Sequence, residues 1–190
     1  MAKVHPSDMR ITIADTAGGL RIVMPCRRSW SVIVFLAFWI CGWAVGEVMV
    51  SRQFLQGDAP AEGEFFMLTW LGVWTGGGVV AVYAWLWQVM GKEIVTVHGQ
   101  TFTVRRDIGG VGFEKDYDLV QMRNLRGQPV GFSPVDLSSS FQLWGVGGMI
   151  AFDYGARTVR FGVGLDEAEV EHVLTSIKQR YRISETTSKK

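Results

Sequence analysis

Two long apolar runs constrain this chain more than any other feature of its sequence. The first, residues 30–50, contains one charged side chain, Glu47, and the second, residues 65–90, contains none. A helix needs about 20 consecutive apolar residues to cross the hydrocarbon core of a bilayer. The two runs therefore predict two transmembrane helices joined by a short loop at 51–64.

The distribution of charge around the two runs predicts their orientation. Basic residues precede the first run and follow the second, whereas the connecting loop is mainly acidic; the residues are Arg21, Arg27, Arg28 and Lys92, against Arg52, Asp58, Glu62 and Glu64. Lysine and arginine are retained on the cytoplasmic side of a membrane. No A-x-A cleavage site follows the first run, so we expect an anchor rather than a removed signal peptide. We expect a multi-pass protein of a bacterial inner membrane with both termini cytoplasmic.

Composition and motifs exclude several classes of function. The net charge is +1 and the basic residues are scattered, which is not the pattern of a nucleic-acid-binding protein. The two cysteines, Cys26 and Cys41, and three dispersed histidines predict no disulfide framework, no metal site and no haem ligand. No nucleophile, metal-binding or phosphate-loop motif occurs, so we expect no catalytic residues and no cofactor.

Period-two alternation outside the apolar runs predicts short antiparallel strands. An N-terminal cytoplasmic segment, residues 1–29, is expected to contain a β-hairpin that pairs with or packs on the domain beginning at Glu93, because two isolated strands are marginal in water. The predicted strands are 10–14, 20–24, 93–98, 101–106, 113–119, 122–126, 149–153 and 158–162, with at most one more near 141–144. Apolar residues at helical spacing predict a closing helix at 166–182, followed by a flexible tail at 183–190.

Glu114, Asp116 and Asp118 alternate along one of these strands. Such carboxylates could gather a hard cation, but no glycine-turned ligand loop surrounds them, and we expect a solvated strand face.

The order of these elements resembles a known domain family. Gly148 to Gly155, Arg157 to Gly162 and the closing helix, together with Gly91-Lys92-Glu93 after the second run, resemble bacterial pleckstrin-homology-like (PH-like) domains that follow a two-helix membrane hairpin. The resemblance implies a binding or scaffolding role for residues 91–182. The first hairpin loop, 98–100, lacks the basic residues with which eukaryotic relatives bind phosphoinositides. The predicted fold class is an α+β membrane protein, with a transmembrane hairpin at 30–90 and a small antiparallel β domain closed by an amphipathic helix.

Small and polar residues within the apolar runs are candidates for contacts in the membrane. Both runs contain a G-x-x-x-G spacing, which lets helix backbones approach closely; the residues are Gly42, Gly46, Gly72 and Gly76. They could contact another membrane subunit, but we favour packing of the hairpin on itself. An ionisable residue in a membrane helix suggests function by default. The expected hairpin register places Glu47 beside Thr69 and Trp70, which could hydrogen-bond its carboxylate near the outer interface.

These features predict a non-catalytic, membrane-anchored module that is an accessory, assembly or scaffolding subunit of an inner-membrane complex. Its expected partners are the lipid bilayer and other membrane-protein subunits. The alternative is an anionic-lipid sensor, in which basic residues near the inner face contact head groups; the candidates are Arg27, Arg28, Lys92, Arg105 and Arg106. The orientation signal already accounts for the first three of these residues.

Overall fold

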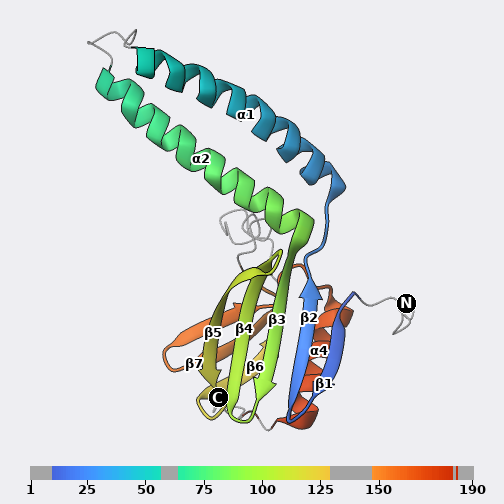
Figure 1. Cartoon of the computed structure of the whole chain (residues 1–190). Coiled ribbons are helices and arrows are strands. Elements are labelled where there is room, and N and C mark those ends of the chain that lie inside the picture. The colour runs from blue at the N-terminus through green and yellow to red at the C-terminus, as the bar shows by residue number, and fades with distance from the viewer. Residues whose placement is uncertain (1–9, 57–63, 129–146, 182, 184–190) are drawn as a thin grey trace. The chain divides into compact units, whose positions relative to one another are not determined.

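The computed structural model describes residues 10–56, 64–128, 147–181 and 183, and it is an α+β structure. The chain forms two compact units (Figure 1). One unit, residues 28–89, is made of two long apolar helices. The other combines residues 1–27 with residues 90–190 and contains all of the described strands and the closing helix.

The two helices are α1 (Trp30–Gln56) and α2 (Glu64–Met90). Both are long and apolar enough to cross a membrane, and only 6% and 11% of the residues in their most apolar windows are buried. The expected end of the first helix was wrong, because residues 51–56 are helical rather than loop. This segment, Ser-Arg-Gln-Phe-Leu-Gln, contains neither glycine nor proline, so nothing in it stops the helix.

The β unit contains two antiparallel sheets and one helix. A five-stranded sheet has the order β1-β2-β3-β4-β5, and a three-stranded sheet has the order β6-β7-β8. In Figure 1 the smaller sheet lies behind the larger one, and the helix α4 lies behind β1 and β2. The elements are β1 (Thr12–Thr16), β2 (Gly19–Pro25), β3 (Gly91–His98), β4 (Thr101–Ile108), β5 (Val111–Asp118), β6 (Met122–Gly127), β7 (Ile150–Tyr154), β8 (Arg157–Phe161) and α4 (Glu167–Arg180).

The N-terminal hairpin belongs to the larger sheet. Strand β2 pairs along its whole length with β3, with Leu20 opposite Val97 and Pro25 opposite Lys92. This confirms that the hairpin does not stand alone. It also means that the chain leaves the sheet after β2, forms both long helices, and returns to the neighbouring position as β3. The backbone N–H of Cys26 donates to the carbonyl of Gly91 at 3.0 Å, which closes the pairing beside this excursion.

The core of the β unit lies between the two sheets and is closed by α4. Phe102 from the larger sheet contacts Phe152 and Phe161 from the smaller sheet edge-on, at ring-centroid distances of 5.6 Å. Helix α4 adds Val173 and Ile177, both fully buried. Aromatic pairs in this geometry stabilise a core beyond their burial alone.

The ends of α4 follow the expected helix closely. Asp166 caps its N-terminus by accepting a hydrogen bond from the Glu169 N–H, and Glu169 accepts one from the Asp166 N–H in return. Beyond the helix, Ile183 is half-buried against the core, so this first residue of the predicted tail contributes to packing. The rest of the tail and the possible strand near 141–144 lie outside the described residues.

Candidate functional site

The two long helices contact each other mainly through tryptophans. The Trp43 indole N–H donates to the carbonyl of Trp74, and that of Trp85 donates to the carbonyl of Ile33, both at 3.2 Å. The Trp43 ring lies against Gly78, where an added Cβ would be 2.1 Å from ring atoms. The close approach of the helices therefore depends on Gly78, which the spacing motifs did not single out.

Three of the four glycines in the two spacing motifs do not lie at the contact between these helices. A Cβ added at Gly42, Gly72 or Gly76 would meet nothing within 4 Å, and one at Gly46 would meet only the Trp74 ring at 3.9 Å. The favoured interpretation, that these glycines pack the hairpin on itself, was therefore wrong for Gly42, Gly72 and Gly76, whereas Gly46 faces Trp74 of the other helix. Gly42, Gly72 and Gly76 instead leave stretches of backbone open on the outside of the helix pair.

Glu47 has a different partner from the one expected. Its carboxylate accepts a hydrogen bond from the Thr75 hydroxyl at 2.7 Å, whereas the Thr69 hydroxyl donates to the carbonyl of Phe65 in its own helix. Trp70 stacks on Trp74 with ring centroids 4.6 Å apart. The register differs because α1 continues past residue 50, which moves the turn between the helices along the chain. The second carboxylate oxygen of Glu47 is buried and has no hydrogen-bond partner among the described residues.

Three of the five candidate lipid-contacting cations are paired with carboxylates of the β unit. Lys92 and Arg105 both contact Asp107, at 3.2 Å, and Arg106 contacts Glu93 at 3.0 Å. Burial raises the pKa of Asp107, but hydrogen bonds from Lys92, Arg105 and the Gly110 N–H lower it more, so the net pKa lies below its usual value. This neutralisation weakens the expected lipid contact of these three residues.

Glu93 is a buried carboxylate that connects the two sheets. Its side chain accepts hydrogen bonds from the backbone N–H groups of Gly162 at 2.6 Å and Val163 at 2.9 Å, as well as from Arg106. A buried charge is tolerated when it is paired and its lone pairs are satisfied. Glu93 therefore ties the start of β3 to the end of β8.

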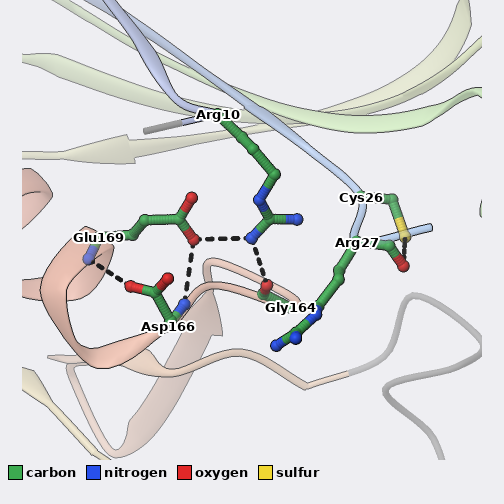
Figure 2. Close-up of polar contacts among 6 residues, drawn as sticks. All are labelled: Arg10, Cys26, Arg27, Gly164, Asp166 and Glu169. Carbon is green, nitrogen blue, oxygen red and sulfur yellow. Dashed lines mark hydrogen bonds and ion pairs between the residues drawn. The ribbon is translucent and has the colours of Figure 1, made fainter. Parts of the chain in front are cut away.

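A second buried carboxylate, Glu169, connects the N-terminal segment to α4 (Figure 2). Arg10 donates to Glu169 at 2.7 Å and to the carbonyl of Gly164 at 3.0 Å. Figure 2 shows that the Glu169 carboxylate lies between the Arg10 guanidinium and the Asp166 backbone. At the other end of the helix, Arg180 forms an ion pair with Asp15 in the β1–β2 turn region.

The remaining two candidate cations, Arg27 and Arg28, are exposed, and no described carboxylate forms an ion pair with either. Arg27 lies beside Gly164, where an added Cβ would approach the Arg27 Cβ to 3.4 Å (Figure 2). These two residues lie where the chain passes from the β unit into α1, and they keep their charge available to an anionic ligand.

A further polar cluster lies at the β6–β7 pair. The Asp153 carboxylate accepts hydrogen bonds from Arg126, Asn124 and Thr158, at 3.0, 2.9 and 2.9 Å, and these bonds lower its pKa to about 2. Asn124 adopts a left-handed backbone conformation, with φ of 52°, where the pairing of β6 with β7 is irregular. The cluster thus holds a strand irregularity in place.

The three acids of β5 each have a separate contact. Glu114 forms an exposed ion pair with Arg105 at 3.8 Å, Asp116 accepts from the Thr103 hydroxyl at 2.6 Å, and Asp118 accepts from the Val120 N–H at 2.9 Å. Within the part of the chain that the structure describes, no three His, Cys, Asp or Glu side chains are grouped to hold a metal ion. Glu114 and Asp116 are exposed and Asp118 is partly exposed, as expected of a solvated strand face.

No family model matches this chain, and no curated protein or solved structure matches it either. The case for its function therefore depends on the geometry of its own residues.

Proposed function

We propose that this chain is a non-catalytic, membrane-anchored PH-like module that serves as an accessory, assembly or scaffolding subunit of a bacterial inner-membrane complex. The observation that carries the proposal is the insertion of two apolar, largely exposed helices between adjacent strands of one sheet. Helices of this length that expose apolar side chains are stable when the hydrocarbon core of a bilayer surrounds them. Both chain connections to the β unit then leave from neighbouring positions, Cys26 and Gly91.

The order of elements in the β unit supports the PH-like assignment. Strands β2 to β5 form a four-stranded antiparallel meander, β6 to β8 form a second sheet, and α4 follows the last strand. Four strands, three strands and a C-terminal helix are the elements of a PH-like domain, to which β1 adds one edge strand. In this reading the first strand of the domain precedes the membrane helices, so the domain comprises residues from both ends of the chain.

The open glycine positions support a membrane-protein partner. Gly72 and Gly76 are four residues apart on α2, so they share one face of that helix, and nothing within 4 Å would contact a Cβ at either. Small residues let a second helix approach a backbone closely, which is how helices associate where lipid offers no hydrophobic driving force. The paired cations favour this role over lipid sensing, because Lys92, Arg105 and Arg106 already have carboxylate partners.

Purification of the full-length protein from native membranes in mild detergent tests the proposal. We expect defined membrane proteins to co-purify with the wild type and to be lost from Gly76→Leu, because the added side chain blocks the open face. Gly77→Leu is the matched control, since Gly77 is equally open but lies about 100° away around the helix. Gly78→Leu, which would collide with Trp43, shows how disruption of the helix pair itself affects co-purification.

One outcome would count against the scaffold, and another would count against the proposed orientation. If the wild type purifies without a partner and binds anionic vesicles with strong salt dependence, the lipid-sensor alternative, through Arg27 and Arg28, replaces it. If a cysteine introduced within residues 57–63 resists an impermeant thiol reagent in intact cells while Ser188→Cys reacts, the cytoplasmic orientation of the termini is wrong.

A further inference from the structure

Two large apolar side chains are exposed at one end of the five-stranded sheet. Val111 is 79% exposed and Phe113 is 87% exposed, and both belong to the edge strand β5. Side chains alternate along a strand, so residues 111 and 113 project from the same face. Exposed apolar residues on an edge strand favour aggregation, so proteins normally cover or avoid them.

The strand register places these residues beside the connections to the helices. Gly91 is opposite Ile108, and Ile108 is opposite Val111, so the β4–β5 turn lies next to the first residue of β3. Met90, which ends α2, packs against this turn: a Cβ added at Gly109 would be 2.9 Å from its sulfur. Only a few residues of chain connect this end of the sheet to the helices, because α1 begins shortly after β2 and β3 directly follows α2.

The turn itself is held in a fixed shape. Gly109 and Gly110 have positive φ angles, 60° and 100°, which suit glycine. The buried Asp107 carboxylate accepts a hydrogen bond from the Gly110 N–H at 3.2 Å, and Arg105 donates to the Gly110 carbonyl at 3.0 Å. Because these hydrogen bonds fix the conformation of the turn, Val111 is held at the surface without the cost of ordering a flexible loop.

Cations flank the same turn. Lys92 and Arg105 contact Asp107, and Arg105 also forms an ion pair with the exposed Glu114 at 3.8 Å, so the charges of these four side chains balance. Because these charges are already paired, the exposed apolar side chains can enter the acyl boundary without taking an unpaired charge with them.

We propose that the β4–β5 turn is a bilayer-inserting wedge, in which Val111 and Phe113 enter the interfacial region of the membrane. The inference rests on the proposed membrane anchoring of α1 and α2 and extends it, because it assigns a lipid-contacting surface to the β unit. The occupant is lipid rather than a protein, because β3, whose first residue Gly91 is aligned with Ile108 and Val111 beside the turn, directly follows the apolar helix α2. The wedge holds one end of the β unit at the membrane surface.

Depth-dependent fluorescence quenching of the full-length protein tests the wedge. Cys26 and Cys41 are replaced by serine, one cysteine is introduced and labelled with an environment-sensitive dye, and the protein is reconstituted in vesicles of zwitterionic and anionic phospholipids. We expect lipids carrying a shallow nitroxide to quench most of the emission from Phe113→Cys, with a blue shift relative to the same protein in urea. Val111→Cys should behave in the same way.

Val120→Cys is the matched control, because Val120 is also an exposed apolar residue, 69%, but follows the opposite end of β5. It should remain unquenched. Phe38→Cys, at an exposed position within α1, reports insertion of the helices themselves. Quenching at 38 without quenching at 113 overturns the wedge while the anchoring stands, and no quenching at 38 overturns both. Equal quenching at 113 and 120 also overturns the wedge, because the contact is then not specific to the turn.

Discussion

At the scale of single residues, the β unit relies on carboxylates whose partners lie far away in the sequence. Glu93 joins β3 to the chain after β8, and Glu169 joins α4 to Arg10. The Glu93 contact could in part have been predicted, because a hairpin turning at residues 99 and 100 places Glu93 opposite Arg106 and Lys92 opposite Asp107. The backbone partners of Glu93, Gly162 and Val163, could not, since nothing local specifies which chain segment crosses that end of the sheet.

Removal of the Glu93 carboxylate should destabilise the β unit strongly. Glu93→Ala leaves Arg106 and two backbone N–H groups without their shared acceptor in a buried position, and breaking a buried ion pair typically costs about 3–5 kcal/mol. Glu114→Ala, at an exposed carboxylate on β5, should change stability by less than about 0.5 kcal/mol. Native-state hydrogen exchange of the β3 and β8 peptides in the full-length protein measures both effects. Equal protection in the two variants would show that the Glu93 contacts contribute little.

Asp153 should make stability depend on acid pH. Its pKa is lowered from 3.8 to about 2 by hydrogen bonds from Arg126, Asn124 and Thr158. A group with a lowered folded pKa stabilises the protein above its unfolded pKa, and the contribution is lost as pH falls through the folded value. The urea midpoint of wild type should therefore exceed that of Asp153→Asn most above about pH 4, and the gap should narrow toward about pH 2. Glu171→Gln, at an exposed carboxylate of α4, is the control, and a gap for Asp153→Asn that does not vary with pH would contradict the assignment.

At the scale of elements, local patterns located the strands well and the helix ends less well. Period-two alternation and glycine-containing turns predicted each of the described strands to within a few residues, because both signals are local. The end of α1 was misplaced because the polar residues 51–53 were taken to end the helix, whereas their backbone propensity allows the helix to continue to residue 56. That difference shifted the expected partner of Glu47 from Thr69 to Thr75.

Disulfide formation can decide between these two registers. In a protein without Cys26 and Cys41, Glu47→Cys combined with Thr75→Cys should cross-link readily under mild oxidation, because the native side chains are in hydrogen-bond contact. Glu47→Cys with Thr69→Cys should not, since Thr69 is exposed and bonded within its own helix. Trypsin cleavage at Arg52 followed by non-reducing electrophoresis shows whether the fragments stay joined. Preferential cross-linking of the 47–69 pair would restore the register expected from sequence.

At the scale of the whole molecule, the sequence predicted the association of the N-terminal hairpin with the later strands but not the form of that association. A hairpin could pack on a sheet or extend it, and pairing between β2 and β3 spans the entire helical unit. The predicted boundary at residue 91 follows the local pattern, yet Leu20, Ile22 and Met24 of β2 are almost completely buried in the same core. Residues 91–190 alone thus lack one strand of their own sheet.

Shortened chains can test whether the β unit needs strands from both sides of the helical unit. A chain in which a short glycine–serine turn replaces residues 28–89 should fold as a water-soluble β unit, because the ends to be joined are already paired through Cys26 N–H and the Gly91 carbonyl. Residues 91–190 expressed alone should remain unfolded or aggregate, since without β2 the larger sheet loses a strand next to β3 and three buried apolar side chains. Each buried side chain of this size contributes roughly 1.5–3 kcal/mol, so their loss together approaches the total stability of a small domain. Amide chemical-shift dispersion in the two shortened chains measures the difference. A well-dispersed spectrum from residues 91–190 alone would show that β2 is dispensable and that the domain begins after the helices.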